Sequence, residues 1–274
     1  MESPLFGKIN LNITRFYYCV SKHIFDEENH TPPPPYNVYR RKRIIKMLKE
    51  LTQTFAMKIC AFAVMDEHTQ MVIYVDENQA KRWNEEAVLT RWESLFPKET
   101  KAFAQLTPEQ QQVKLKLWRS RLKNPKWYLR CLVDKISEQV MFEPYDIGRF
   151  MLHPFFCSGL CSDGEIAQGM AQADLTPMRD NDVESLEASD FTSIQERIHY
   201  LDEQLKLVPR VRHSDLAEQP KDLMELQLYQ GPRTKKPKIN FNLNEYTQLL
   251  EYAIKMIRAN PHQEEENPSE HAYE

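Results

Sequence analysis

Residues 60–75 constrain the fold of this chain more than any other segment. The run is apolar and rich in β-branched and aromatic residues at both ends, and polar residues interrupt it around His68. This pattern predicts two strands, 58–64 and 70–75, with a short junction between them. Residues two apart on a strand share one face of the sheet, so His68 and Gln70 are expected to point the same way. That spacing suits a pair of metal ligands, but an amide is a poor second ligand.

The residues before this run add a strand and a helix. Residues 15–22 are aromatic and β-branched and predict a first strand. Four consecutive prolines at 32–35 forbid regular structure, and a helix is expected from about 38 to 55 because its apolar residues recur on one face. The order strand, helix, strand, strand indicates an α+β protein with helices packed on a sheet.

Apolar spacing predicts a series of helices from residue 77 to about 140, inserted into the sheet. Thr107 has the features of a helix start, because Pro108 follows it and Gln110 stands three residues later. Pro125 begins a further helix. Four tryptophans at helical spacing are expected in the core: Trp83, Trp92, Trp118 and Trp127.

The second half of the chain predicts one more strand and then helices. A strand is expected at 148–157, and Pro154 favours an edge or a bend for it. Helices are expected from Ser162 or Asp163 to about Thr176, from 189 to 198 and from 243 to 258, with a loose stretch over 208–237. We therefore expect a domain over 1–200 with its helical insertion at about 77–140, and a C-terminal extension over 201–274.

Composition is that of a globular protein without a membrane segment. The 274 residues are 41% hydrophobic, which is enough to bury a sizeable core. No apolar run approaches the roughly 20 residues that span a bilayer, and the first residues lack a basic start followed by an apolar stretch. A cytoplasmic protein is expected. The five cysteines lack paired spacing and are expected to be reduced thiols.

Charge is segregated along the chain although the formal net charge is only −4. Residues 40–49, 119–130 and 233–238 are basic, whereas the tail from 264 onwards is acidic. Such basic stretches can follow a phosphate backbone. The alternative is that they are solvated helix faces.

Four segments resemble motifs of the REP-associated single-tyrosine transposases of the HUH class. They are residues 16–22, 61–72, 148–150, and 170–179 continuing into 189–197. They occur in the order of that family and together span about residues 15–200. The last segment is the longest and the most specific of the four.

The resemblance implies a ferredoxin-like core that acts on single-stranded or hairpin DNA. In this family two strand histidines separated by one hydrophobic residue hold a divalent cation, Mg²⁺ or Mn²⁺. A helix supplies a nucleophilic tyrosine and, one turn later, an Asn or Gln. The cation polarises the scissile phosphate, and the phenolate attacks phosphorus to give a 5′-phosphotyrosine intermediate.

Most of that machinery is replaced in this chain. His68 matches the first metal histidine, but Gln70 stands at the second, Gln172 at the tyrosine and Thr176 at the polar residue one turn later. An amide carbonyl can still coordinate Mg²⁺, so the metal site is weak or vestigial. A carboxamide cannot become an anionic oxygen nucleophile, and loss of a nucleophile removes several orders of magnitude in rate. We expect a transposase-like DNA-binding protein that does not catalyse transposition.

Several basic residues are candidates for DNA contacts. Lys22, Arg149 and Arg179 match basic positions of the family motifs. The first helix adds Arg40, Arg41, Lys42, Arg43 and Lys46. These side chains can bind phosphates or exposed bases, and structural salt bridges are the alternative.

Several further interpretations remain open. Asp66 and Glu67 put carboxylates where a phosphate would approach, so they are either added cation ligands or a sign that the pocket no longer serves phosphates. The acidic tail fits a protein-interaction module, or a relic without DNA binding. An active enzyme would need a substitute nucleophile, for which the candidates are Tyr128, Tyr145, Tyr200, Tyr246 and Tyr252. The resemblance leaves open whether the protein is a monomer or a homodimer.

Overall fold

The structure, a computed structural model, describes residues 9–24, 36–140, 151–152, 155–179, 183–207, 219–227 and 237–259. The strands are β1 (Phe16–Ile24), β2 (Met57–Val64), β3 (His68–Val75), β4 (Met151–Leu152) and β5 (Phe156–Leu160). The first helices are α1 (Tyr36–Thr54), α2 (Glu77–Arg82), α3 (Glu85–Leu95), α4 (Pro97–Lys101), α5 (Pro108–Leu122) and α6 (Pro125–Val140), with a 3₁₀ turn, η1 (Phe103–Gln105), before α5. The later helices are α7 (Asp163–Asp174), α8 (Thr176–Arg179), α9 (Ser193–Leu207) and α10 (Leu243–Ala259). The expected α+β class is confirmed.

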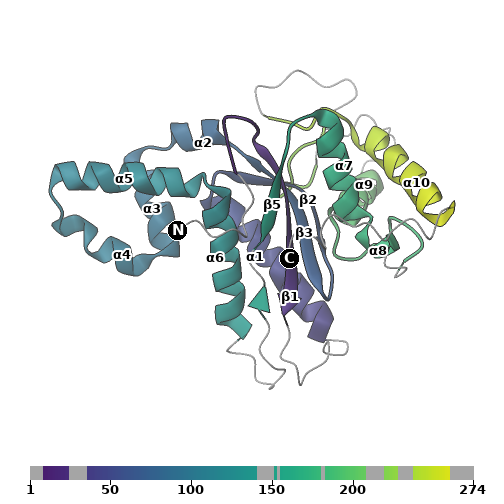
Figure 1. The fold of residues 1–274 in the computed structure, drawn as a ribbon, viewed down its shortest axis with the longest axis horizontal. Coiled ribbons are helices and arrows are strands. Elements are labelled where there is room, and N and C mark those ends of the chain that lie inside the picture. Colours follow the sequence, from purple (N-terminus) through teal and green to yellow (C-terminus); the bar gives the residue numbers. More distant parts are fainter. Residues whose placement is uncertain are drawn as a thin grey trace.

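An antiparallel five-stranded sheet lies at the centre of the molecule (Figure 1). Its order is β2-β3-β1-β4, and β5 also pairs with β1. β5 pairs with the first part of β1, opposite Phe16–Val20, and β4 pairs with its end, at His23 and Ile24. The single strand expected over 148–157 is therefore two pieces beside β1. Pro154 itself lies outside the described residues.

Alternate residues of the central strands enter two separate cores, one on each face of the sheet. Tyr17 and Cys19 of β1 point into the first core, and Tyr18 and Val20 point into the second. On β2 the pairing register shifts between Ile59 and Ala61. This irregularity resets the alternation along β2. Met57 and Ile59 before it and Phe62 and Val64 after it therefore all enter the first core.

The first core packs the sheet against α1, α3, α5 and α6, and α3 and α5 lie on the left in Figure 1. Its aromatic centre is Trp92, which stacks on Trp118 with ring centroids 5.8 Å apart and contacts the edge of Trp127 at 5.5 Å. Trp83 packs against this core from its rim, so the expected core role of the four tryptophans is confirmed. The helix start at Thr107 is also confirmed, because Thr107 and Gln110 form a reciprocal capping box.

The second core packs the opposite face of the sheet against α7 to α10 and residues 219–227 (Figure 1). Gly169 of α7 lies directly over the sheet, where an added Cβ would come within 3.1 Å of Leu160 and 3.5 Å of Val72. The lack of a side chain at this position allows the helix to approach the sheet closely.

The expected helix at 189–198 begins later than predicted, at Ser193. Residues 189–192 instead form a turn that bridges to the free edge of β2, at Ala63 and Thr192. A second bridge joins Ile59 to Leu223 within the stretch expected to be loose. Both bridges cover an edge that would otherwise expose unpaired backbone groups.

A buried carboxylate, Asp174 at the end of α7, joins three helices. It accepts hydrogen bonds from Ser193 Oγ at 2.7 Å, from the backbone nitrogen of Ile194 at 2.9 Å and from Tyr246 Oη of α10 at 2.7 Å. The C-terminal helix is thus bonded to the centre of the molecule. Burial raises the pKa of Asp174 to about 6, while these three hydrogen bonds and the charge of nearby Arg197 oppose the rise.

The described residues contain no helix that is long and apolar enough to cross a membrane. All five cysteines are free thiols, and four of them are buried.

We predict that Asp174→Ala lowers the free energy of unfolding by about 2–4 kcal/mol, because three buried donors lose their acceptor. Asp174→Asn should cost less, since its amide can accept from Ser193 and donate to Tyr246.

A carboxyl group whose pKa is raised by folding stabilises the fold fully only below its unfolded pKa of about 4, and that contribution is lost as the pH rises through 6. Urea unfolding between pH 4 and pH 8 should therefore show the wild type losing about 2–3 kcal/mol relative to Asp174→Asn. Parallel pH profiles for the two proteins would contradict the assignment.

Candidate functional site

His68 and Gln70 lie on the sheet face that packs against α7. They continue the alternation of Val72 and Tyr74, which belong to the core on that side. In the register of β1 and β3, Lys22 stands opposite His68. Lys22 is exposed, so it places a positive charge at the end of this face.

Gln70 is held by a tyrosine that the sequence did not single out. Tyr18 Oη donates a hydrogen bond of 2.7 Å to Gln70 Oε1. Tyr18 is on the neighbouring strand, two residues from the partner of Gln70 in register and on the same face. The amide oxygen that could coordinate a cation is therefore already engaged.

His68 has a neutral ring with one unengaged nitrogen. Its Nε2 is buried and makes no hydrogen bond within the described residues. Burial lowers the pKa of His68, the charge of Glu67 opposes this effect, and Lys22 adds to it. A neutral imidazole nitrogen without a proton is the form that binds metals.

These residues do not fit a divalent cation site. Apart from His68, the face offers Gln70, whose oxygen accepts from Tyr18. No group of three or more His, Cys, Asp or Glu side chains able to hold a metal occurs in the described parts of the chain. A stable site for Mg²⁺ or Mn²⁺ normally includes carboxylates or several oxygen ligands.

Gln172, which the resemblance sets at the nucleophile position, lies in the last turn of α7, and Thr176 begins α8 just after it. Gln172 is half-buried, and its backbone oxygen accepts from Thr176 Oγ1 at 3.0 Å and from Arg179 Nη1 at 3.3 Å. Thr176 is buried. Thr176 and Arg179 thus satisfy a carbonyl at the helix C-terminus, and Arg179 keeps further donors because a guanidinium has five.

Several basic residues of α1 are bound within the molecule. Arg41 Nε lies 3.4 Å from Asp66 Oδ1, and its guanidinium covers the ring of Phe191 at 4.1 Å. Lys46 pairs with Glu50 at 3.7 Å along the exposed face of the helix.

Three more basic positions on α1, together with Arg149, complete the predicted set. Arg43 lies 5.7 Å from the ring centroid of Tyr39. Arg40 is half-buried and adds to the lowering of the pKa of His23. Lys42 is exposed and forms no ion pair with the described residues. Arg149 lies outside the described residues.

His23 fixes the turn that leads into His68. Its Nδ1 lies 2.7 Å from the backbone oxygen of Asp66, and its Nε2 lies 2.9 Å from Thr69 Oγ1. Because a carbonyl can only accept, Nδ1 carries the proton and Nε2 accepts from Thr69. Burial lowers the pKa of His23 to about 3, so the ring stays neutral in this role. Sequence reasoning missed His23, since nothing local marks a histidine whose partners lie 43 and 46 residues away.

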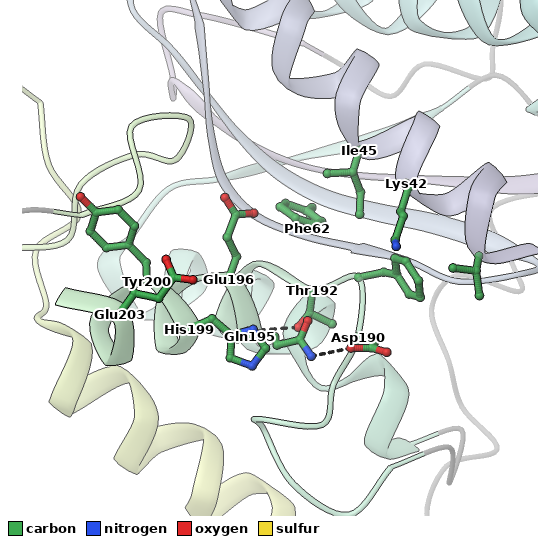
Figure 2. A pocket seen from close by; sticks show the side chains of 12 residues that line it. Lys42, Ile45, Phe62, Asp190, Thr192, Gln195, Glu196, His199, Tyr200 and Glu203 are labelled. Atoms are coloured by element: carbon green, nitrogen blue, oxygen red, sulfur yellow. Dashed lines mark hydrogen bonds between the residues drawn. The ribbon is translucent and has the colours of Figure 1, made fainter. Parts of the chain in front are cut away.

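Figure 2 shows a groove of about 490 Å³ between α1 and α9. Lys42 and Ile45 line one wall, and Phe62 forms part of the floor. On the other wall Gln195 Nε2 donates to Asp190 Oδ1 at 2.6 Å. The groove also contains the carboxylates of Glu196 and Glu203. Glu196 is paired with Lys49 of α1 at 2.6 Å, so an ion pair bridges the two helices.

The segment 189–197, which carries the most specific resemblance, makes internal contacts. Thr192 Oγ1 donates to the backbone oxygen of Ser189 at 2.7 Å, and Ser193 bonds to Asp174. Arg197 is fully buried and donates to the backbone oxygens of Cys60 at 3.0 Å and Met224 at 2.9 Å. The turn places Phe191 at φ 66°, a conformation that bulky residues rarely adopt. The polar side chains of this segment therefore build the scaffold beside β2.

Two of the candidate substitute tyrosines are buried and bonded. Tyr128 Oη donates to the backbone oxygen of Leu48 at 2.8 Å, and Tyr246 donates to Asp174. Burial raises the pKa of both phenols, which opposes formation of the phenolate nucleophile. Tyr200 lines the groove and Tyr252 is exposed on α10. Tyr145 lies outside the described residues.

No protein-family model matches the chain, and no curated protein matches it. Among solved structures, a REP-associated tyrosine transposase bound to a REP hairpin aligns with 82% of this chain and 95% of that chain. The TM-score is 0.42 and the sequence identity is 8%. A likeness at this level carries no argument about the function of this chain.

We predict that Gln70→His creates a metal site that the wild type lacks, because it adds a second imidazole on the face of His68. Isothermal titration with Mn²⁺ should give millimolar or weaker affinity for the wild type and a dissociation constant at least about tenfold lower for the variant. Gln53→His, at an exposed position on α1, is the matched control and should behave as the wild type. Micromolar Mn²⁺ binding by the wild type would show that its residues do form a cation site.

Proposed function

We propose that this chain is a DNA-binding protein derived from the single-tyrosine HUH transposases, which binds single-stranded or hairpin DNA without cleaving it. The observation that carries the proposal is the position of His68, Gln70 and Lys22 on one sheet face beside the helix of Gln172. This is the arrangement that the family motifs require if Gln70 and Gln172 stand in the places of a metal ligand and a nucleophile.

The strand order supports the same origin. Read from β5, the order is β5-β1-β3-β2, with α1 connecting β1 to β2. We propose that these elements form a ferredoxin-like core. Within this proposal, residues 77–140 are an insertion into that core and residues 201–274 are an extension.

Loss of strand transfer follows from the side chains present. An amide at position 172 cannot attack phosphorus and then leave as an oxygen anion. The hydroxyl group nearest the site, Tyr18 Oη, donates its hydrogen bond to Gln70. Tyr18 lies on β1, which is paired on both sides within the sheet. Among the described residues, no group of three or more His, Cys, Asp or Glu side chains could hold a cation that would activate this hydroxyl. Binding without covalent chemistry is therefore the function that these residues support best.

Some of the basic residues predicted to contact DNA already form ion pairs within the chain. Arg41 and Lys46 each have a carboxylate partner in the chain, so a phosphate would compete with that partner. Lys42 is exposed and has no carboxylate partner among the described residues, and Arg179 has donors beyond its bond to Gln172. Lys22 is included because it is exposed at the end of the sheet face that carries His68. We assign the phosphate contacts to Lys22, Lys42 and Arg179.

We predict that the protein binds a labelled DNA hairpin or single strand with an affinity that falls as salt rises. Lys22→Glu and Lys42→Glu should each weaken binding and reduce the slope of log affinity against log salt by about 1, because each removes one phosphate contact. Fluorescence anisotropy between about 50 mM and 200 mM salt measures both quantities. Lys116→Glu reverses an exposed charge on α5 in the insertion and serves as the matched control.

Two results would overturn the proposal. One is the absence of binding at about 50 mM salt, where phosphate contacts are strong. The other is a covalent protein–DNA adduct on a denaturing gel after incubation with hairpin DNA and Mn²⁺. An adduct lost in Tyr18→Phe would identify an active transposase-like enzyme with a relocated nucleophile.

A further inference from the structure

Helix α10 carries an apolar stripe that the described residues leave exposed. One face of the helix is buried through Tyr246, Leu250 and Ile254. On another face Leu249, Tyr252 and Met256 are exposed by 39%, 63% and 46%. At about 100° per residue these three side chains fall within an arc of about 60°, so they form one continuous stripe.

The stripe is accessible from outside. In Figure 1 α10 is the outermost element on its side of the sheet, and no other labelled element lies beyond it. Exposed large hydrophobic residues that line up along a helix indicate a contact surface, whereas isolated ones are ordinary.

Two opposite charges border the stripe on the same flank. Glu251 and Lys255 are both exposed and stand four residues apart, a spacing at which such residues often pair along a helix. They form no ion pair with each other or with any other described residue. Each charge is thus available to a partner.

We infer that α10 pairs with α10 of a second copy of this chain in an antiparallel, two-fold symmetric contact. A two-fold contact uses the same patch on both copies and must be self-complementary. With Tyr252 close to the axis, Leu249 of one copy lies level with Met256 of the other. In the same register Glu251 lies within about one residue of Lys255 of the other copy, and the symmetry repeats that ion pair.

The pattern distinguishes a second copy from other occupants. A membrane surface would favour a basic border, but this border is one acid and one base. An acidic or a basic peptide would likewise meet one unfavourable charge. Only an antiparallel copy matches both charges and both ends of the apolar stripe at once.

The contact is small, so the dimer is expected to be weak. A pair of short helix faces buries less than the roughly 1,200 Å² at which stable interfaces begin. Association should therefore appear only at high protein concentration. It does not depend on the proposed DNA binding, and the two are tested separately.

Sedimentation velocity of the full chain, from about 10 µM to about 1 mM, should show a reversible monomer–dimer equilibrium. Tyr252→Glu should abolish the dimer over this range, because it buries a charge in the stripe. Glu251→Lys and Lys255→Glu should each weaken the dimer about five- to tenfold, because each replaces two attractive pairs with two repulsive ones. These side chains are exposed, so circular dichroism should show the wild-type fold in all variants.

The decisive sample is an equimolar mixture of Glu251→Lys and Lys255→Glu. One copy then carries two lysines and the other two glutamates, so an antiparallel heterodimer regains both ion pairs and wild-type affinity. The control is Glu86→Lys, which reverses the charge of an exposed residue on α3 and should leave association unchanged. A wild type that is monomeric at every concentration, a dimer that persists in Tyr252→Glu, or a mixture no stronger than its two components would each overturn the inference.

Discussion

Strand β1 holds this molecule together, because it is hydrogen-bonded along both edges and sends alternate side chains into two separate cores. β3 lies on one side of it, and β4 and β5 lie on the other. Because side chains alternate along β1, Tyr18 and Lys22 lie on the sheet face that packs against α7. The pairing register of β1 with β3 places His68 and Gln70 beside them on the same face. A shift of one residue would move all of these groups to the face of α1. The site therefore depends on the register of a single strand pair.

Two features limit the chemistry of the sheet face that carries His68: the hydrogen bond from Tyr18 to Gln70, and the lack of a phenol at position 172. Tyr18 donates to the oxygen of Gln70, so the buried Nε2 of His68 has no free oxygen ligand beside it on this face. In the proposed function, Gln172 supplies an amide where strand transfer would need a nucleophile. The neighbouring turn is held by His23 and by the pair of Arg41 with Asp66, so the acid that was a candidate cation ligand has an internal role. What remains is a surface with an exposed lysine, Lys22, beside His68, and this is why we propose binding and not catalysis.

The segment with the strongest family resemblance turned out to serve the scaffold. Ser193 bonds to Asp174, and Arg197 bonds to backbone oxygens of β2 and of residues 219–227. A buried arginine with carbonyl partners fixes the position of α9 beside the sheet, because its donors would be costly to leave unpaired. The C-terminal helix joins the same network through Tyr246. One side of α10 is therefore buried in the fold, and the apolar stripe on another side stays exposed, which is the basis of the proposed contact with a second copy.

The sequence by itself determined the order of the elements, the α+β class, the capping box at Thr107 and the shared face of His68 and Gln70. These features depend on local periodicity and on neighbours a few residues apart, which a sequence displays directly. It did not reveal that Tyr18 engages Gln70, that His23 clamps the turn at Asp66, or that the basic residues Arg41 and Lys49 have acidic partners. Helix α9 also started later than its apolar pattern predicted, because residues 189–192 bridge to β2 instead. Each of these contacts joins residues 25 to 147 positions apart, so only the tertiary structure decided them.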